Sequence, residues 1–243
     1  MIVQACLNGA RPVTHHHALS LTVAAMASDA AACVAAGAAE LHLHPRGADG
    51  RESLAPAAVD ATVPAIRRAC PGTLVGVSTG AWIEGDPDRT LACIEAWREP
   101  PDYASVNLAE PGAPAVMERL WRQGIGVEAG LASVADVERL ITLGVGARAL
   151  RVLVKIGEQD WEEAVAVIEG IEAALACAGL RRPMLLHGLD RTVWRFVKRA
   201  ADRRLSARVG LEDGCLLLDG TTAPNNAALV AAAVEVFARS LRP

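Results

Sequence analysis

The sequence predicts a (β/α)8 barrel that forms one domain over residues 1–243. Eight short apolar runs alternate with longer amphipathic segments, with a repeat of roughly 30 residues that is typical of this fold. The chain length suits a single barrel domain, and polar residues gather where the predicted strands end. A doubly wound open sheet is the competing architecture, but such sheets usually have fewer strands, and no G-x-G-x-x-G turn follows the first strand.

The strands are predicted from runs rich in Leu or β-branched residues. Helices are predicted between them where apolar residues recur at helical spacing and where Gly or Pro marks an end. In chain order, the predicted strands span residues 2–8, 40–44, 74–78, 103–108, 126–131, 149–156, 183–188 and 206–212. The helices with the clearest signals span 20–37, 60–70 (before Pro-Gly), 87–97 (before Pro-Pro), 135–143 (before Gly144) and 226–241.

Composition narrows the classes of partner. The chain is 52% hydrophobic but only 3% aromatic, so its core must consist mainly of Ala, Val and Leu. A net charge of -4 without a basic tract argues against nucleic-acid and membrane partners and favours a small molecule. The Ala-rich stretch from Ser20 to Gly37 is interrupted by Ser28 and Asp29, so we expect a buried helix there. Six scattered cysteines and the lack of a signal peptide predict a reducing, cytoplasmic location.

The main indication of an active site is the set of polar residues at the predicted strand ends. In a (β/α)8 barrel, the carboxyl ends of the strands form the rim that carries the chemistry. Packing alone does not explain why seven or eight separate strands each bring a polar group to that rim. These residues are Asn8, Arg11, His42, His44, Ser78, Thr79, Ser105, Asn107, Glu128, Lys155, His187, Arg208, Glu212 and Asp213.

A metal site is the first candidate function for this rim. His42 and His44 are two residues apart on a strand, so both side chains face the same side and can approach one ion. Two imidazoles suit Zn²⁺, and also Ni²⁺, Co²⁺ or Mn²⁺. Glu212 supplies a third ligand if the chain turns after the last strand, which leaves Asp213 free as a base beside the metal. The alternatives are structural histidines and an acidic pair that only caps a loop.

Other rim residues give weaker signals. The small residues of Ser78-Thr79-Gly80 leave backbone N–H groups open to an oxyanion or carboxylate, although this sequence is also an ordinary turn. Glu128, His187 and Lys155 can equally form ion pairs across the barrel mouth. The His15-His16-His17 run is expected in a solvated loop, because consecutive side chains point in different directions.

Several motifs occur in one order along the chain and together resemble the β-keto acid cleavage enzymes. They are NGAR, AGAAELHLHPRG, GRESL, GVSTGAW, PDYASVN, GVEAG, LLHG, RVGLED and NNAALV, covering about residues 4–236.

This resemblance implies a zinc-bearing barrel, forming homo-oligomers, that condenses a β-keto acid with acetyl-CoA and releases acetoacetate and a new acyl-CoA. It further implies a role for each matching residue: His42, His44 and Glu212 as zinc ligands, Asp213 as general base, Arg208 as its activator and a carboxylate contact, and Ser78, Ser105 and Glu128 as pocket residues.

The sequence also departs from the family pattern. Arg11 replaces an acidic residue of members that recognise an amino group, which predicts a substrate without a distal amine, either neutral or with a second carboxylate. Lys155 stands where many relatives carry an acid. The expected substrate-binding residues are Arg11, Thr79, Gly80, Ser105, Asn107 and Asn8. The cations available to the phosphates of acetyl-CoA are Arg46, Lys155, Arg191 and Arg11.

Two other functions stay open at this point. A metal-dependent hydrolase of the amidohydrolase type also uses an H-x-H pair in a barrel, but it places the pair on the first strand and needs further histidines from middle strands. A non-catalytic barrel that binds a metabolite is the other, although a metal-ligand set next to a free Asp would then bring no benefit in packing.

Overall fold

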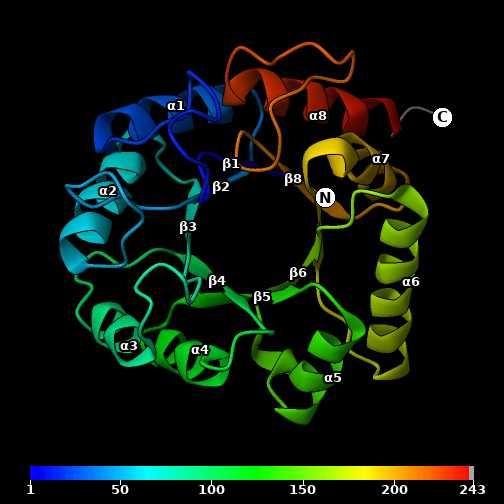
Figure 1. Cartoon of the computed structure of the whole chain (residues 1–243), viewed down its shortest axis with the longest axis horizontal. Helices are drawn as coiled ribbons and strands as arrows, with labels where there is room; N and C mark the ends of the chain where they lie inside the picture. Colours follow the sequence, from blue (N-terminus) through cyan, green and yellow to red (C-terminus); the bar gives the residue numbers. More distant parts are fainter. Residues whose placement is uncertain (241–243) are drawn as a thin grey trace.

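A computed structural model describes residues 1–240 and confirms the closed parallel barrel. Eight strands pair in sequence order, and β1 pairs with β8 to close the ring, as Figure 1 shows in a view down the barrel. The strands are β1 (Val3–Cys6), β2 (Glu40–Leu43), β3 (Leu74–Ser78), β4 (Tyr103–Asn107), β5 (Gly126–Leu131), β6 (Arg151–Ile156), β7 (Met184–Gly188) and β8 (Ser206–Val209).

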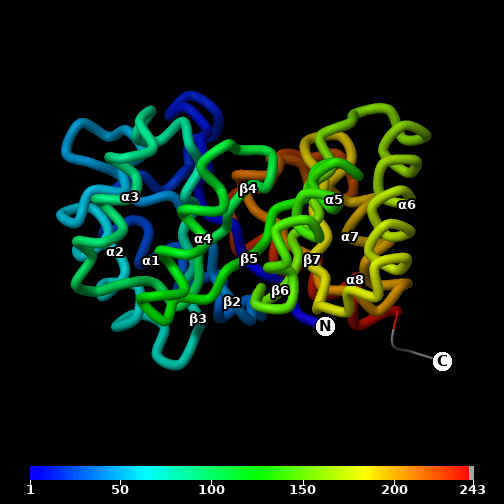
Figure 2. The backbone as a smooth tube through the Cα atoms, turned by 90° about the horizontal axis from the view of Figure 1, so that it is seen from below, coloured from blue at the N-terminus to red at the C-terminus, as the bar shows by residue number. Residues whose placement is uncertain are grey.

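An outer ring of helices surrounds the strands (Figure 1). In the side view of Figure 2 the N-terminus lies at the lower end of the barrel, so the carboxyl ends of the parallel strands lie at the upper end. The helices are α1 (Val23–Ala35), α2 (Pro56–Ala69), α3 (Pro87–Glu95), α4 (Ala113–Arg122), α5 (Val134–Thr142), α6 (Trp161–Cys177), α7 (Val193–Asp202) and α8 (Asn226–Ser240).

The element boundaries differ from the prediction at a few places. α2 begins four residues early, because Pro56 at its first turn fixes a helical φ and needs no N–H partner. β8 ends at Val209, not at 212, because Gly210 lies against the main chain at the end of β1: a Cβ on it would sit 1.9 Å from the Cys6 carbonyl oxygen. The predicted end of the last helix at 241 lies outside the described residues.

Small apolar side chains form the core between strands and helices, as the composition predicts. Inside the barrel is a buried polar cluster. The Tyr103 hydroxyl donates to the Leu41 carbonyl (2.7 Å) and accepts from Gln4 (2.8 Å), and Glu128 binds Arg151 at 2.7 Å. Gly76 makes room for the Tyr103 ring, since a Cβ there would be 2.1 Å from it. This cluster fills the inside of the barrel with hydrogen-bonded side chains, although Glu128 Oε2 is buried without a partner.

The cysteines agree only in part with the expectation of small buried hydrophobes. All six are free thiols, and Cys6, Cys33 and Cys70 are buried, but Cys177 is exposed. Within residues 1–240, no helix has the length and apolar character needed to cross a membrane.

Candidate active site

A cavity of about 350 Å³ opens at the carboxyl ends of the strands. Since the strands are parallel, side chains from β2 through to the turn after β8 converge on it. Among the residues that line it are His42, His44, Ser78, Ser105, Lys155, His187, Arg208 and Glu212, together with Arg11, Trp82 and Asp190 from the loops.

His42, His44 and Glu212 form a compact cluster of metal-ligand atoms. The Nε2 atoms of the two histidines are 3.4 Å apart. Glu212 places Oε1 3.6 Å from His44 Nε2 and Oε2 3.9 Å from His42 Nε2. Ligands about 2.0–2.1 Å from a tetrahedral zinc ion are separated from one another by about 3.3 Å. The spacing in the structure is therefore close to that of a metal-bound set.

The bonding of these three side chains also fits a metal ion. The contact between His44 Nδ1 and the carboxylate of Glu52 places the ring proton on Nδ1, so Nε2 offers its lone pair to the cluster. Glu212 Oε2 is buried without a hydrogen-bond partner. Burial lowers the pKa of His42 well below its usual value, which keeps that imidazole neutral. Burial opposes ionisation of Glu212, but the Arg208 guanidinium holds its pKa well below the usual value. Neutral imidazoles and an ionised carboxylate are the forms that bind Zn²⁺.

Glu212 lines the cavity, and Asp213 lies buried next to it against the lining residues His187 and Arg208, because both acids lie in a turn. The Gly210 carbonyl accepts the N–H groups of Asp213 (2.9 Å) and Gly214 (3.0 Å), which reverses the chain just after β8. Adjacent residues of a continuous strand would face opposite ways. The turn explains how Glu212 lines the cavity while its neighbour Asp213 contacts two of the other lining residues.

Asp213 is a fully buried carboxylate with one oxygen held and one free. Its Oδ1 lies 2.7 Å from His187 Nε2 and 3.2 Å from an Arg208 nitrogen. Its Oδ2 is buried and has no hydrogen-bond partner. Arg208 also binds Glu212, so one guanidinium bridges the acid of the metal cluster and the acid beside it. Burial lowers the pKa of His187, which makes it a neutral partner for Asp213.

Five of the sequence-predicted site residues use their polar atoms for structure. Asn8 is fully buried; its amide nitrogen donates to the carbonyls of Ser20 and His44 (both 3.0 Å), and its oxygen accepts the His44 N–H (2.9 Å). The expectation of open N–H groups at Thr79 and Gly80 is wrong. Thr79 donates its N–H to the Ser105 carbonyl (3.2 Å), and Gly80 donates to the Ser78 hydroxyl (3.3 Å).

Asn107 and Glu128 also lie outside the lining of this cavity. The Asn107 amide bridges Glu110 and Lys155, at 2.7 and 2.9 Å. Glu128 points into the interior of the barrel, where it binds Arg151 and accepts from Gln4 at 3.2 Å. The expected rim position of Glu128 is therefore wrong, because it belongs to the buried polar cluster.

Arg11 lines the cavity but already has partners. Its Nη2 lies 2.7 Å from Asp190 Oδ1, and its Nε donates to the Glu212 carbonyl at 2.9 Å. This ion pair joins the loop after β1 to the loop after β7. Arg11 thus lies at the cavity wall, paired with Asp190.

A family model for beta-keto acid cleavage enzymes matches residues 1–243. The chain belongs to the beta-keto acid cleavage enzyme family. No curated protein matches it in sequence.

Solved structures support the barrel fold of this family member. A ternary complex of ObcA with C4-CoA adduct and oxalate superposes with a TM-score of 0.72 at 18% identity, covering 89% of this chain and 63% of ObcA. A binary complex of ObcA with oxaloacetate gives 0.73 at 18% identity and the same coverage. The 3-dehydroquinate dehydratase from Aquifex aeolicus VF5 gives 0.57 at 13% identity, with both chains fully covered. This chain therefore spans less than two thirds of the ObcA chains.

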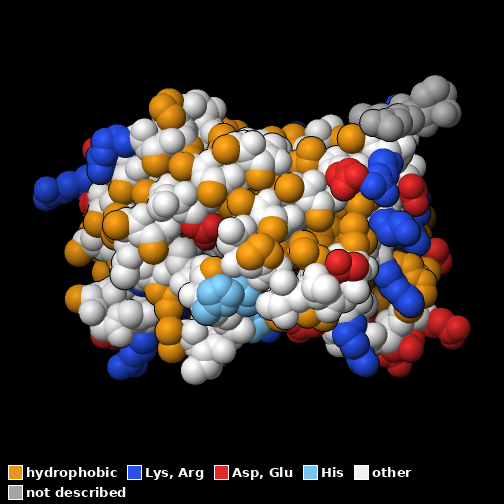
Figure 3. Space-filling view, turned by 90° about the horizontal axis from the view of Figure 1, so that it is seen from above, with side chains coloured by type: hydrophobic (Ala, Val, Ile, Leu, Met, Phe, Trp, Pro, Cys, Tyr) orange, Lys and Arg blue, Asp and Glu red, His pale blue; other side chains and the backbone are white. Residues whose placement is uncertain are grey.

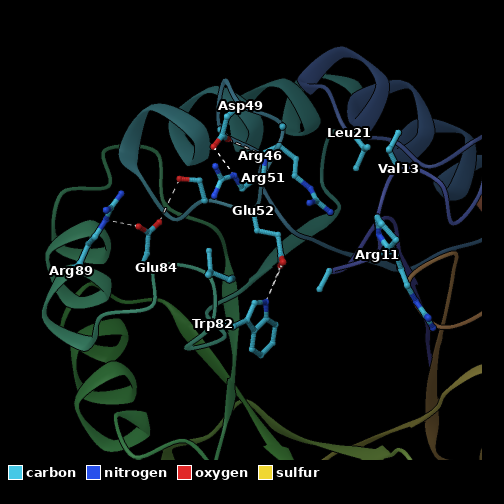
Figure 4. A pocket seen from close by; sticks show the side chains of 16 residues that line it. Arg11, Val13, Leu21, Arg46, Asp49, Arg51, Glu52, Trp82, Glu84 and Arg89 are labelled. Atoms are coloured by element: carbon cyan, nitrogen blue, oxygen red, sulfur yellow. Dashed lines mark hydrogen bonds and ion pairs between the residues drawn. The ribbon is translucent and has the colours of Figure 1, made fainter.

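The loops of this beta-keto acid cleavage enzyme family member form a second, outer cavity of about 820 Å³ beside the first. Figure 4 shows Arg11 and Trp82 on its walls, and both residues also line the inner cavity. Two of its arginines have acidic partners: Arg51 with Asp49 at 3.2 Å and Arg89 with Glu84 at 2.6 Å. Its charged lining consists of Arg11, Arg46, Arg51 and Arg89 together with Asp49, Glu52 and Glu84.

Glu52 and Trp82 are site residues that the sequence reasoning missed. The segment after β2 folds back on itself through the antiparallel bridge between Arg46 and Glu52, which brings the Glu52 carboxylate to His44. Trp82 Nε1 donates to the same carboxylate at 3.1 Å. The available signal was an acidic residue close in sequence to a suspected histidine ligand.

The His15-His16-His17 run is a partly solvated loop, as predicted, with one exception. His16 is 6% exposed, and its Nδ1 accepts the Ala18 N–H at 3.1 Å. His42, His44 and His187 are buried, so the pale-blue surface patch in Figure 3 belongs to this run, where His17 is exposed.

Proposed function

We propose that this protein condenses a β-keto acid with acetyl-CoA in a zinc-dependent reaction and releases acetoacetate and a new acyl-CoA. The observation that carries the proposal is the cluster of His42, His44 and Glu212, with Asp213 held beside it. Zn²⁺ bound by these three side chains would supply a Lewis acid for the carboxylate and keto oxygens of the substrate.

Asp213 is the group that would move the first proton. Its free Oδ2 takes a proton from the carbon between the carboxylate and the keto group, while Arg208 and His187 hold Oδ1. That carbon attacks the thioester carbonyl of acetyl-CoA, and the CoA thiolate leaves. The thiolate then adds to the original keto carbon and the bond between the two halves breaks, which releases the new acyl-CoA. The acetoacetate carbanion left behind takes the proton back from Asp213.

The outer cavity is the proposed site of acetyl-CoA. Its volume suits a long co-substrate, and Arg11 and Arg46 on its walls are two of the four cations considered for the phosphates. Lys155 lines the inner cavity, and Arg191 lines neither of the two. A structural relative, ObcA, has been described with a C4-CoA adduct and with oxaloacetate, which supports pairing a CoA thioester with a keto acid.

One assay tests this function. Purified protein should contain about one zinc per chain and form acetoacetate only when both a β-keto acid and acetyl-CoA are present. Asp213→Asn should retain the zinc and lose turnover, because the amide cannot accept the proton. CoA-independent hydrolysis of an amide or ester would instead support the amidohydrolase alternative. A zinc-free protein without either activity would support a non-catalytic barrel.

We also propose a homo-oligomer that acts in the cytoplasm, as its family resemblance implies. Light scattering during gel filtration measures the assembly directly. A monomer at micromolar concentration would contradict this part of the proposal without affecting the chemistry.

A further inference from the structure

We propose that Lys155 binds a second carboxylate of the substrate in the inner cavity, apart from the metal cluster. It thereby selects β-keto acids that carry another anionic group at their far end. This proposal rests on the proposed function for its reaction, but its ligand site can be tested by binding alone. The residues that carry it are Lys155, Asn107, Ser105 and Ser78.

Lys155 is a cation without an acidic partner. It lies near the end of β6 and lines the cavity, and its Nζ donates to Asn107 Oδ1 at 2.9 Å. Among residues 1–240, no carboxylate lies within the 4.0 Å of an ion pair with it. An ammonium group has three donors and a full charge, so one neutral amide leaves most of its bonding capacity unused.

The scaffold fixes the direction of this lysine. The Asn107 amide donates to Glu110 Oε1 at 2.7 Å, which turns its oxygen towards Lys155. β5 lies between the two residues, and it carries Gly130 beside Asn107. A Cβ on Gly130 would lie 3.1 Å from Asn107 Oδ1, so the glycine leaves room for this amide. The arrangement holds Lys155 at the cavity wall without neutralising it.

The other cations of the cavity are balanced by the protein. Arg11 pairs with Asp190, and Arg208 contacts both Glu212 and Asp213. Glu212 in turn belongs to the metal cluster. Once a divalent ion is bound, the cavity carries excess positive charge at two places, the metal and Lys155. A substrate with two carboxylates neutralises both, whereas a substrate with one leaves Lys155 uncompensated in a partly buried site.

Two hydroxyl groups of the cavity complete the ligand site. Ser78 and Ser105 are register partners on β3 and β4 and both line the cavity. The Ser78 hydroxyl accepts the Gly80 N–H, so its own hydrogen is free to donate. Carboxylates bind through such a combination of an ammonium and hydroxyl donors. Burial and the nearby Arg208 lower the pKa of Lys155, and a bound anion would favour its charged form.

The activity test uses matched six-carbon substrates, 3-oxohexanedioate and 3-oxohexanoate, with acetyl-CoA. Wild type should prefer the dicarboxylic substrate, and Lys155→Met should lower kcat/KM for it by about 10- to 100-fold while changing the other less than about 3-fold. The chain has only two lysines, so Lys198→Met on the exposed side of α7 is the matched control and should behave as wild type. A wild-type preference for 3-oxohexanoate, or an equal loss on both substrates, would overturn the proposal.

Binding measurements separate this site from the reaction. Glutarate should bind zinc-loaded wild type and the Lys198 variant more tightly than butyrate does, and Lys155→Met should weaken glutarate binding by about 10-fold. That result would support the anion site even if no keto acid were turned over, in which case only the proposed function would fail. A glutarate affinity equal to that of butyrate would contradict the site. A higher KM of Lys155→Met for acetyl-CoA, with an unchanged ratio of kcat/KM between the two keto acids, would also contradict the site. A substrate adduct trapped on Lys155 by borohydride would contradict it as well.

Discussion

Asn8→Ala should weaken the fold and the metal site together, although its sequence position suggested a substrate contact. The side chain makes three hydrogen bonds to buried main-chain groups of Ser20 and His44. At about 1 kcal/mol net for each bond, their loss lowers the free energy of unfolding by about 3 kcal/mol. For a chain of this size, the melting temperature should fall by about 6–12 °C. Zinc affinity should also fall, because Asn8 fixes the main chain of His44.

The assay compares thermal melts of metal-free protein, zinc affinity by chelator competition, and KM for the keto acid. Asn225→Ala is the control, since this exposed side chain makes a single capping bond to the Ala228 N–H at 3.0 Å. The control should lose about 1 kcal/mol and keep its zinc affinity. An unchanged melting temperature for Asn8→Ala, combined with a raised KM, would show that Asn8 contacts substrate and would refute the structural reasoning.

Glu52→Gln should lower zinc affinity by about 10- to 100-fold, because His44 loses its orienting carboxylate; chelator competition measures this, and the exposed Glu99→Gln should change nothing. Asp29 is held by Asn226 (2.7 Å), and burial raises its pKa above 3.8. The folded state thus retains the proton longer than the unfolded chain, so the contribution of Asp29 to stability falls as pH rises above that value. Asp29→Asn should therefore gain stability relative to wild type in urea unfolding as the pH rises above about 4, and a difference independent of pH would argue against this linkage.

The sequence was sufficient for the barrel because its signals are local. Period-two apolar runs and helix-ending Gly or Pro residues located every strand, and the two-residue spacing of His42 and His44 already put both on one face. The end of β8 was misplaced because Gly210 turns the chain against Cys6, a contact between residues far apart in the sequence.

The site residues were harder to predict, because a polar side chain near a strand end has several possible partners. Asn8 and Asn107 lie near strand ends but outside the cavity lining, because they are engaged by main-chain or side-chain groups that no spacing reveals. Glu128 looks in the sequence like an acid at the barrel rim. Its place in the interior depends on its ion pair with Arg151 on the neighbouring strand, which the sequence does not show. Glu52 reaches His44 through a loop that folds back, and loop paths depend on tertiary contacts.

The shared wall between the two cavities makes them energetically interdependent. Glu52 touches His44 on one side and Trp82 on the other, and Trp82 faces both cavities. A molecule that enters the outer cavity and displaces the indole also changes the hold of Glu52 on the imidazole. Such coupling is reciprocal. The factor by which the molecule in the outer cavity changes the affinity of the protein for the metal equals the factor by which the metal changes the affinity of the protein for that molecule. If the proposed thioester co-substrate occupies the outer cavity, metal loading would change its affinity by that same factor.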